Sequence, residues 1–480
     1  MYRPLSRSLA TRQGHFVTGK YDQSQEVGAN SIPYQAFSQA FNQLCRYLLT
    51  ESPAQLAYWR ETILHAVGTN ARLLTDIIPD LALVVGPQPP VATVTTAEAQ
   101  NRFQRVFLNF VRAIAHSEHP LVLFIDDLQW ADGASLQLLQ SLFDYAASEN
   151  NTAQGLMLIG AYRNNEVNAH HPLTHTVDAL AEKGINPTVI ELDNLPVSAV
   201  NAWIAESLDC LPEQSQSLAE LVHEKTLGNA FFTAEFLKTL YSERLLKMAD
   251  EKTHNTVQWQ WDTDQIRLQN ITDNVVDLMT QKLADLPDET TEALQLAACW
   301  GSQFSLLSLA LVTQQPEAEV LQRLMPAIQL GFLLPLDNRY KLLLEGDRPL
   351  GVEFRFQHDR VQQAAYALIP EGQSAQLHFQ IGRSLWKSEK AGDNLFERVN
   401  HLNLGAAFIT HDPELSQLVA LNLRAGQQAL TENAYEAAKA YFDTGLRQLA
   451  NLDLDEDALD LPLLLGAAKA ACSLGQWEPM

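Results

Sequence analysis

Two hydrophobic patterns alternate along the first third of the chain. Residues 121–125 and 155–161 are runs of mostly apolar residues without a polar side, and such runs are typical of strands buried on both faces of a parallel sheet. Other stretches place apolar residues at helical spacing; these are Tyr34, Phe37, Phe41, Leu44 and Leu48, then Trp59 and Ile63, then Phe103, Val106, Phe107, Phe110 and Ile114. The alternation predicts an α/β core built around a parallel sheet.

The run at 121–125 ends in two carboxylates, Asp126 and Asp127. Carboxylates directly after a parallel strand lie where doubly wound sheets bind ligands, and their oxygens suit a magnesium ion that carries nucleotide phosphates. The alternative is a core strand followed by a polar turn, in which Asp132 caps the next helix.

The complete segment 121–132, LVLFIDDLQWAD, closely resembles the Walker B element of STAND-type signalling ATPases. These proteins are relatives of AAA+ ATPases, and the similar modules, of the origin-recognition-complex-like AAA group, lie inside large bacterial serine/threonine or histidine sensor kinases. The resemblance implies ATP or ADP as the ligand. It also implies that Asp126 binds Mg²⁺ and that Asp127 is the catalytic residue, which orients the attacking water.

Residues 14–20, GHFVTGK, fit the spacing of a phosphate-binding P-loop. Tyr21 stands where a P-loop needs a small hydroxyl residue, and no helical pattern begins there. We therefore expect a strand at His15–Thr18. In the family a P-loop and its helix precede such a strand, so Met1–Leu9 is expected to end that helix and the chain to lack its Walker A. The alternative is a divergent P-loop at residues 14–20.

The strand expected at 155–161 is followed by Arg163. A cationic side chain at this position would reach the γ-phosphate in a P-loop ATPase, and the resemblance places the family's sensor 1 here. The alternative is a loop arginine paired with Glu166. Thr188–Leu192 is expected to be the last strand of the core.

Helical patterns at Val200–Leu208 and Leu218–Lys225 predict a small helical lid. Gly228 and Asn229 follow. In STAND ATPases a Gly-Asn-Pro motif opens a lid helix near the adenine, so the resemblance implies that both residues bind nucleotide, although Ala230 replaces the proline. The alternative is a plain helix C-cap.

Helices at Asn274–Leu286 and around Leu294, with extended segments at 332–334 and 354–356, predict a winged helix. The segment offers no recognition helix rich in lysine or arginine, as DNA binding would need. The resemblance instead implies a domain that clamps the nucleotide.

His358 and Asp359 follow the second of these extended segments. They resemble the family's His-Asp motif, in which the histidine approaches the β-phosphate of ADP; an imidazole can donate a hydrogen bond to phosphate. The alternative is that both residues only cap the helix that begins there.

From about Ser374 the chain shows helical patterns without strand signals. Residues 433–442, NAYEAAKAYF, resemble the turn and second helix of a tetratricopeptide repeat, and residues 475–478 resemble the next turn. Small alanines let paired helices approach closely, and the aromatic side chains fill the space between neighbouring helices. Because the second repeat stops at its turn, we expect a truncated repeat array.

Charge and composition narrow the function. The chain carries 33 Lys and Arg against 57 Asp and Glu, a formal net charge of -24, which disfavours nucleic acid and anionic membranes as partners. The four cysteines are scattered without a Cys-x-x-Cys motif, as in a reduced cytoplasmic protein. No apolar stretch reaches the roughly 20 residues that span a bilayer.

We therefore predict an α/β P-loop NTPase-like core with a partial parallel sheet at 1–195, a helical lid at 196–270, a winged-helix domain at 271–370 and tetratricopeptide-like repeats at 371–480. The predicted function is a STAND-type ATPase switch from a signal-transduction kinase, poorly active alone. It would bind ATP or ADP with Mg²⁺, bind proteins through its repeats and act on kinase domains of its parent chain. Two alternatives remain: a scaffold without enzymatic activity, and a winged-helix transcription regulator.

Overall fold

The computed structural model describes residues 14–22, 32–92, 96–147, 155–185, 187–248, 259–268, 272, 274–345, 351–387, 395–452 and 457–475. The chain divides into two compact units. The first comprises 1–187 together with 372–480, and the second comprises 188–371. Met1–Leu9, expected to be a helix end, lies outside the described residues.

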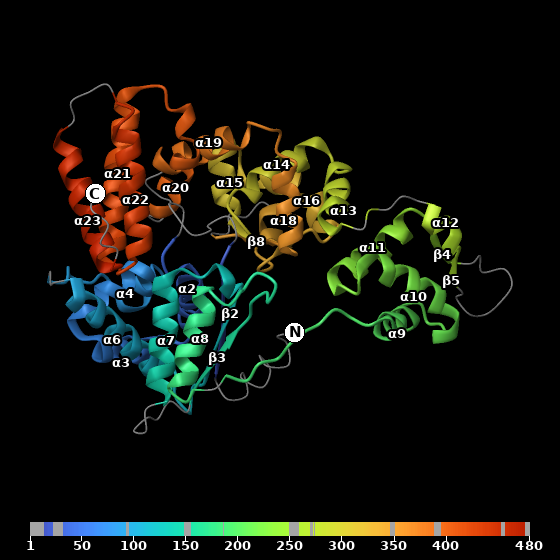
Figure 1. Cartoon of the computed structure of the whole chain (residues 1–480), viewed down its shortest axis with the longest axis horizontal. Helices are drawn as coiled ribbons and strands as arrows, with labels where there is room; N and C mark the ends of the chain where they lie inside the picture. Colours follow the sequence, from blue (N-terminus) through green and yellow to red (C-terminus); the bar gives the residue numbers. More distant parts are fainter. Residues whose placement is uncertain are drawn as a thin grey trace. The chain divides into compact units, whose positions relative to one another are not determined.

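A parallel sheet organises the α/β part of the first unit (Figure 1). Its strands are β1 (His15–Lys20), β2 (Leu121–Asp126) and β3 (Leu156–Gly160), in the order β1-β2-β3. The ladder pairs Lys20 with Asp126 and Ile125 with Gly160, so the three carboxyl ends meet at one edge of the sheet. The predicted strands at His15–Thr18, 121–125 and 155–161 are confirmed, as is the α/β class with a parallel sheet.

Helices surround this sheet and share one hydrophobic core with it. Ring pairs of Phe107 with Phe37 and Phe41, at centroid distances of 5.8 and 5.3 Å, show that the predicted aromatic stripes belong to this core. The helices are α2 (Gln35–Leu48), α3 (Pro53–Val67), α4 (Ala71–Ile77), α5 (Leu81–Val85), α6 (Thr96–Ile114), α7 (Gly133–Ala147) and α8 (Pro172–Glu182).

The outer edge of β1 is closed by two glutamines of α2. Gln39 Oε1 accepts the Lys20 N–H and Gln43 Oε1 accepts the Thr18 N–H, each at 2.9 Å. An unpaired strand edge is a template for pairing with other chains. These side chains satisfy the donors that another strand would otherwise take.

The outer edge of β3 has no such cover. Because Gly155 O and Ala161 N bond to β2, the backbone groups of Leu156, Leu158 and Gly160 point away from it. Within the described residues no hydrogen bond to these outward groups is found.

The strand predicted at Thr188–Leu192 is wrong, since these residues adopt no regular structure. Val189, Ile190 and Leu192 are 65%, 77% and 77% exposed. An apolar run becomes a strand only when it finds a partner strand, and among the described residues this run has none.

The remainder of the first unit is helical. It contains α19 (Ser374–Lys387), α20 (Leu395–Leu404), α21 (Asp412–Thr431), α22 (Tyr435–Leu449) and α23 (Asp457–Ser473). A Cβ at Gly426 or Gly466 would lie 2.5 Å from the Phe442 ring, so glycine is needed where these helices cross. The predicted close helix packing is observed; that these helices are tetratricopeptide repeats stays a prediction.

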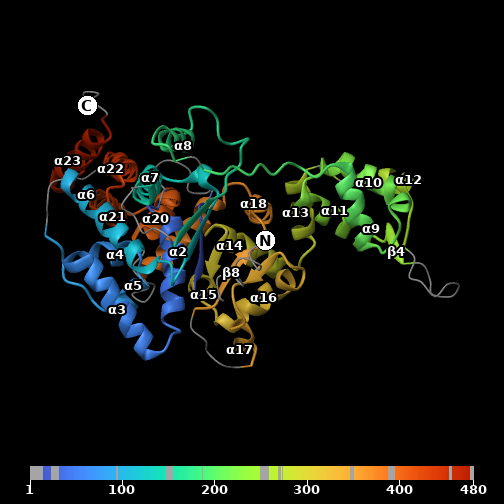
Figure 2. The same ribbon diagram turned by 90° about the horizontal axis from the view of Figure 1, so that it is seen from below.

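The second unit begins with helices and continues with a three-stranded antiparallel sheet of order β6-β8-β7. Figure 2 shows the helices and strands of this unit from a second direction. The helix and strand order that a winged helix needs is present, and the assignment itself stays a prediction. Its elements are α9 (Val197–Ser207), α10 (Pro212–Thr226), α11 (Ala230–Ser242), β4 (Leu246–Met248), β5 (Trp259–Trp261), α12 (Thr263–Leu268), α13 (Val275–Ala284), α14 (Asp288–Ala298), β6 (Gln303–Ser305), α15 (Leu306–Thr313), α16 (Glu317–Gln329), β7 (Leu333–Pro335), α17 (Tyr340–Leu344), β8 (Glu353–Phe356) and α18 (Asp359–Ala367).

In the part of the chain that the structure describes, none of the helices combines the length and apolar character needed to cross a bilayer.

Replacing both Gln39 and Gln43 by leucine should promote self-association. Leucine keeps the size of the side chain but removes the oxygens that accept the β1 N–H groups, which leaves an apolar open edge. Light scattering of the purified chain should show larger particles. Gln281→Leu, at an exposed position of α13, is the matched control; equal aggregation by the control would contradict the edge-capping role.

A buried histidine pair in α19 and α20 predicts loss of stability in weak acid. His378 Nδ1 lies 2.8 Å from His401 Nδ1, and burial lowers their pKa values to about 4 and about 3. The unfolded chain therefore binds more protons than the folded chain below about pH 6.5. As the pH decreases below this value, the free energy of unfolding decreases by up to about 1.4 kcal/mol per pH unit for each histidine. The melting temperature should thus drop between pH 6.5 and 4.5.

The double variant His378→Gln, His401→Gln removes both titrating rings. Its melting temperature should depend less on pH over this range, whereas exposed His175→Gln should follow the parent chain. An unchanged pH dependence in the double variant would show that other groups control acid stability.

Candidate functional site

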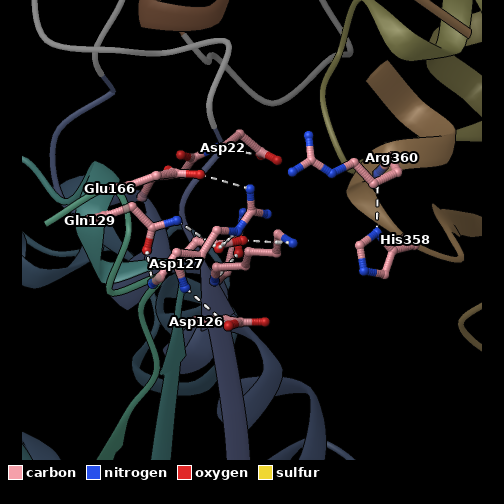
Figure 3. Close-up of polar contacts among 11 residues, drawn as sticks. Asp22, Asp126, Asp127, Gln129, Glu166, His358 and Arg360 are labelled. Atoms are coloured by element: carbon pink, nitrogen blue, oxygen red, sulfur yellow. Dashed lines mark hydrogen bonds and ion pairs between the residues drawn. The ribbon is translucent and has the colours of Figure 1, made fainter. Parts of the chain in front are cut away.

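Asp126 and Asp127 lie at the carboxyl edge of the parallel sheet (Figure 3). Asp126 is the last residue of β2, and its Oδ1 accepts the Asp127 N–H at 3.0 Å. Asp127 has a left-handed backbone with φ of 53°. Such a conformation is uncommon outside glycine and is tolerated best by Asp and Asn. The sharp turn aims the two carboxylates in different directions.

The Asp127 carboxylate is buried and held by charge. Its Oδ2 forms an ion pair with Lys20 Nζ at 2.9 Å, and its Oδ1 lies 3.5 Å from Arg163 Nε. Asp127 is 5% exposed, and a buried charge is tolerated only when it is paired. One cation at the end of β1 and one in the segment after β3 thus compensate the carboxylate that follows β2.

Arg163 pairs with Glu166 and also lies beside Asp127. Its Nη1 donates to Glu166 at 3.0 Å, as in the loop interpretation, and its guanidinium lies 4.9 Å from the centroid of the Trp130 ring. The same side chain also stands beside Asp127. The sensor 1 role of Arg163 stays a prediction.

Gln129 organises this site in a way that the sequence did not reveal. Its Nε2 donates to Asp127 Oδ1 at 2.9 Å, and its Oε1 accepts the Arg163 N–H at 3.2 Å. His171 Nε2 lies 3.1 Å from the Gln129 carbonyl oxygen. Gln129 is 5% exposed, so it fixes both Asp127 and the chain after β3. In the sequence, Gln129 stands out only as a polar residue between the apolar Leu128 and Trp130.

Lys20 was also missed as a site residue. In the sequence it completed a P-loop pattern, but residues 15–20 form a strand, and a Cβ at Gly19 would lie 1.8 Å from the Ala36 carbonyl oxygen. The strand interpretation is thus confirmed. The pairing of Lys20 with Asp126 in the ladder brings its side chain to Asp127.

Gly228 and Asn229 belong to the second unit and have structural roles there. Gly228 has φ of 76°, and a Cβ would lie 2.0 Å from the Leu195 carbonyl oxygen, so only glycine fits. Asn229 caps α11, since its side chain accepts the Phe232 N–H at 2.9 Å. Their predicted nucleotide contacts stay a prediction.

His358 lies in the same unit and caps α18. Its Nδ1 accepts the Arg360 N–H at 3.1 Å (Figure 3). The imidazole stacks on Phe231 of α11, with ring centroids 4.1 Å apart. The helix-capping interpretation is thus observed. Because Nδ1 is an acceptor here, a neutral ring carries its proton on Nε2 and can donate from that atom.

Asp126 and Asp127 suit a Mg²⁺ ion that keeps water and phosphate oxygens as most of its ligands. Mg²⁺ prefers six oxygen ligands and retains water and phosphate oxygens in nucleotide sites. Within the described residues no group of three or more His, Cys, Asp or Glu side chains is arranged to hold a metal ion. Asp126 therefore supplies the chemistry for one or two protein oxygens of a magnesium–phosphate complex, but not a complete metal site.

A family comparison matches residues 2–159 to the AAA ATPase domain. The matched region contains β1, β2, all but the last residue of β3, and both carboxylates. This match confirms the predicted resemblance to AAA-type ATPases.

Two curated relatives are histidine kinases. The chain is 28% identical to hybrid signal transduction histidine kinase G of Dictyostelium discoideum, over 90% of the chain and 15% of that protein. It is 19% identical to histidine protein kinase 1 of Candida albicans, over 71% of the chain and 16% of that protein. The chain thus spans about one-sixth of the length of these relatives. A bacterial origin stays a prediction.

A solved structure of a signal transduction ATPase with numerous domains, from Pyrococcus horikoshii and with a tetratricopeptide repeat sensor, aligns with 98% of the chain and 62% of its own length. The TM-score is 0.41 and the identity 13%.

The coupling between Lys20 and Asp127 should exceed that of an exposed ion pair. Removing one partner of a buried pair leaves an uncompensated charge. Because Lys20 is 27% exposed and Arg163 remains, we expect Lys20→Met to lower the free energy of unfolding by about 1–3 kcal/mol. Urea unfolding of Lys20→Met, Asp127→Asn and the double variant gives the coupling energy.

Lys183 and Asp144 provide the matched control in the same unit. Their ion pair measures 2.6 Å, but the side chains are 47% and 40% exposed, so their coupling should be below about 1 kcal/mol. Equal coupling in the two cycles would show that the burial of Asp127 does not make its pairing special.

Proposed function

We propose that this chain, whose first third matches an AAA ATPase domain, is the nucleotide-dependent switch module of a histidine-kinase signalling protein. The observation that carries the proposal is the Asp126–Asp127 pair at the carboxyl edge of a parallel sheet, with Lys20 and Arg163 beside it. Ligands of α/β sheets bind at this edge. Two carboxylates with adjacent cations suit a phosphate chain and its magnesium ion.

The two carboxylates would have different roles. Asp126, at the strand end, would bind Mg²⁺ through its oxygens. Asp127 would accept a hydrogen bond from the water that attacks the γ-phosphate and would thereby orient this water. Its side chain is now paired with Lys20 and Arg163. A phosphate that attracted Arg163 would loosen this pairing and release Asp127 for the water.

The principal phosphate grip would come from a further strand. The outer edge of β3 offers the backbone groups of Leu156, Leu158 and Gly160, and Met157 on this strand is 51% exposed. We propose that a parallel strand ending in a glycine-rich loop pairs with this edge in the parent protein. Its backbone N–H groups and lysine would surround the phosphates, so residues 1–480 alone should hydrolyse little ATP.

The second unit would contribute to nucleotide sensing through His358. Its neutral tautomer presents Nε2–H, which can donate to the β-phosphate of ADP. Gly228 and Asn229 at the start of α11 would lie near the adenine. The stack of Phe231 on His358 ties these two motifs together, which supports assigning them to one site.

The parent's output is proposed from its relatives. Both curated relatives named above are histidine kinases, so exchange of ADP for ATP would control a kinase domain, and the helical repeats would bind protein partners in the cytoplasm. The formal net charge of -24 argues against the transcription regulator. The scaffold alternative is separated from the switch by nucleotide binding.

Titration with a fluorescent ATP analogue tests this proposal on residues 1–480 and on the chain extended at its N-terminus by a β-strand and a glycine-rich phosphate-binding loop. The extended chain should bind the analogue in a Mg²⁺-dependent way and residues 1–480 only weakly. Asp126→Asn should weaken binding by about tenfold or more, because an amide cannot match a carboxylate on a hard cation. Asp127→Asn should retain binding but slow hydrolysis.

The exposed carboxylate Asp144, replaced by asparagine, controls for loss of charge. Equal loss of binding in the Asp126 and Asp127 variants would contradict the division of roles. Absence of binding by the extended chain would favour the scaffold.

A further inference from the structure

Tyr34 forms hydrogen bonds to both the α/β core and the helical repeats of the first unit. Tyr34, 3% exposed, precedes α2 and has a left-handed backbone with φ of 57°. Its N–H donates to Asp132 Oδ2 at 3.2 Å, and its hydroxyl donates to the Glu432 carbonyl oxygen at 2.8 Å. One residue therefore connects the segment after Asp127 with the turn between α21 and α22.

Asp132 also determines how α7 begins. Its Oδ1 accepts the Ser135 N–H at 2.9 Å, which caps the helix. A Cβ at Gly133 would lie 3.1 Å from Glu436 Oε2 on α22. The carboxylate of Glu436 thus faces the start of α7, where the helix dipole favours negative charge. The repeats touch the segment after Asp127 at a second point.

The turn between α21 and α22 is buried by these contacts. Glu432 is 7% exposed, and Asn433, with φ of 63°, is 3% exposed. Ala134 of α7 is among the side chains packed against the core of the repeats. Undocking the repeats would therefore expose polar groups of the turn and the start of α7 together.

We propose that Tyr34, Asp132, Glu432 and Glu436 form a latch that releases the helical repeats from the α/β core when Glu432 ionises. The latch is defined by contacts within the chain, so its test needs no nucleotide. Since the same segment carries Asp126 and Asp127, opening the latch frees the connection that follows the two carboxylates.

The surroundings of Glu432 favour its neutral form. Burial, together with the charges of Asp76 and Asp132, raises its pKa to about 8, although the hydrogen bond that its side chain accepts from Gln428 at 2.8 Å acts in the opposite direction. The ionisable groups that face it are Asp76 on α4, which pairs with Arg72 at 2.7 Å, Asp132 before α7, Tyr34 before α2, and Tyr435 and Tyr441 on α22.

The direction of the pH effect follows from this shift. Docked Glu432 has a raised pKa, whereas the exposed side chain titrates near 4.5. Docking therefore takes up a proton between these values and is strongest at low pH. The docking constant should fall by about tenfold per pH unit up to about pH 8 and then level off.

Hydrogen–deuterium exchange between pH 6 and 9, corrected for the intrinsic exchange rate, measures this opening in the complete chain. The amides of 434–438 and of 133–137 should lose protection together as the pH rises. Glu432→Gln, which mimics the neutral acid, should keep both segments protected across the range. Tyr34→Phe should lower the protection of both by about two- to tenfold at every pH, because it removes one hydrogen bond.

Glu213→Gln at an exposed position of α10 is the matched control and should follow the parent chain. Asp132→Asn provides a second test should Glu432→Gln fold poorly: removing the neighbouring charge lowers the pKa of docked Glu432, so the loss of protection with rising pH should be smaller and should level off at a lower pH. A Glu432→Gln profile identical to the parent, or independent changes in the two segments, would overturn the latch.

Discussion

The buried carboxylate of Asp127 is the constraint on which the ends of the three strands depend. Asp127 turns away from Asp126 through a left-handed backbone, and its charge is compensated by Lys20 and Arg163. Lys20 is the last residue of β1 and Arg163 follows β3. The carboxylate after β2 therefore holds the ends of all three strands of this sheet together. Gln129 completes the arrangement by hydrogen bonding both Asp127 and the Arg163 backbone.

This arrangement gives the site two properties at once. A desolvated carboxylate paired with cations is stable, yet the cations are also the groups that phosphate would attract. A phosphate chain that binds here would therefore compete with Asp127 for Lys20 and Arg163. The segment from Asp126 to Asp132 continues into α7, whose first turn touches α22. The strand ends are thus connected through the start of α7 with α22.

Local patterns in the sequence predicted most of the fold. The apolar run 121–125 and the aromatic stripe of Phe103, Phe107 and Phe110 identify their elements because burial requires those periods. The carboxylates were found because strand ends have a characteristic position in α/β sheets. Residues 188–192 show the limit: their composition suits a strand, but pairing depends on another segment, which local sequence cannot supply. The pairing of Lys20 with Asp127 was missed for the same reason, since it follows from the register of β1 with β2. Likewise, Gln39 and Gln43 become edge caps only through the packing of α2 on β1.

Binding of a divalent cation together with nucleotide is the central claim, and electron paramagnetic resonance with Mn²⁺ in place of Mg²⁺ measures it most directly. In the chain extended at its N-terminus by a β-strand and a glycine-rich phosphate-binding loop, ADP should convert free Mn²⁺ into a bound signal. With Asp126→Asn that signal should be lost or strongly weakened, because Asp126 supplies the protein oxygen. An undiminished nucleotide-dependent Mn²⁺ signal in the variant would show that the metal lies elsewhere and would contradict the assignment of the sheet edge as the nucleotide site.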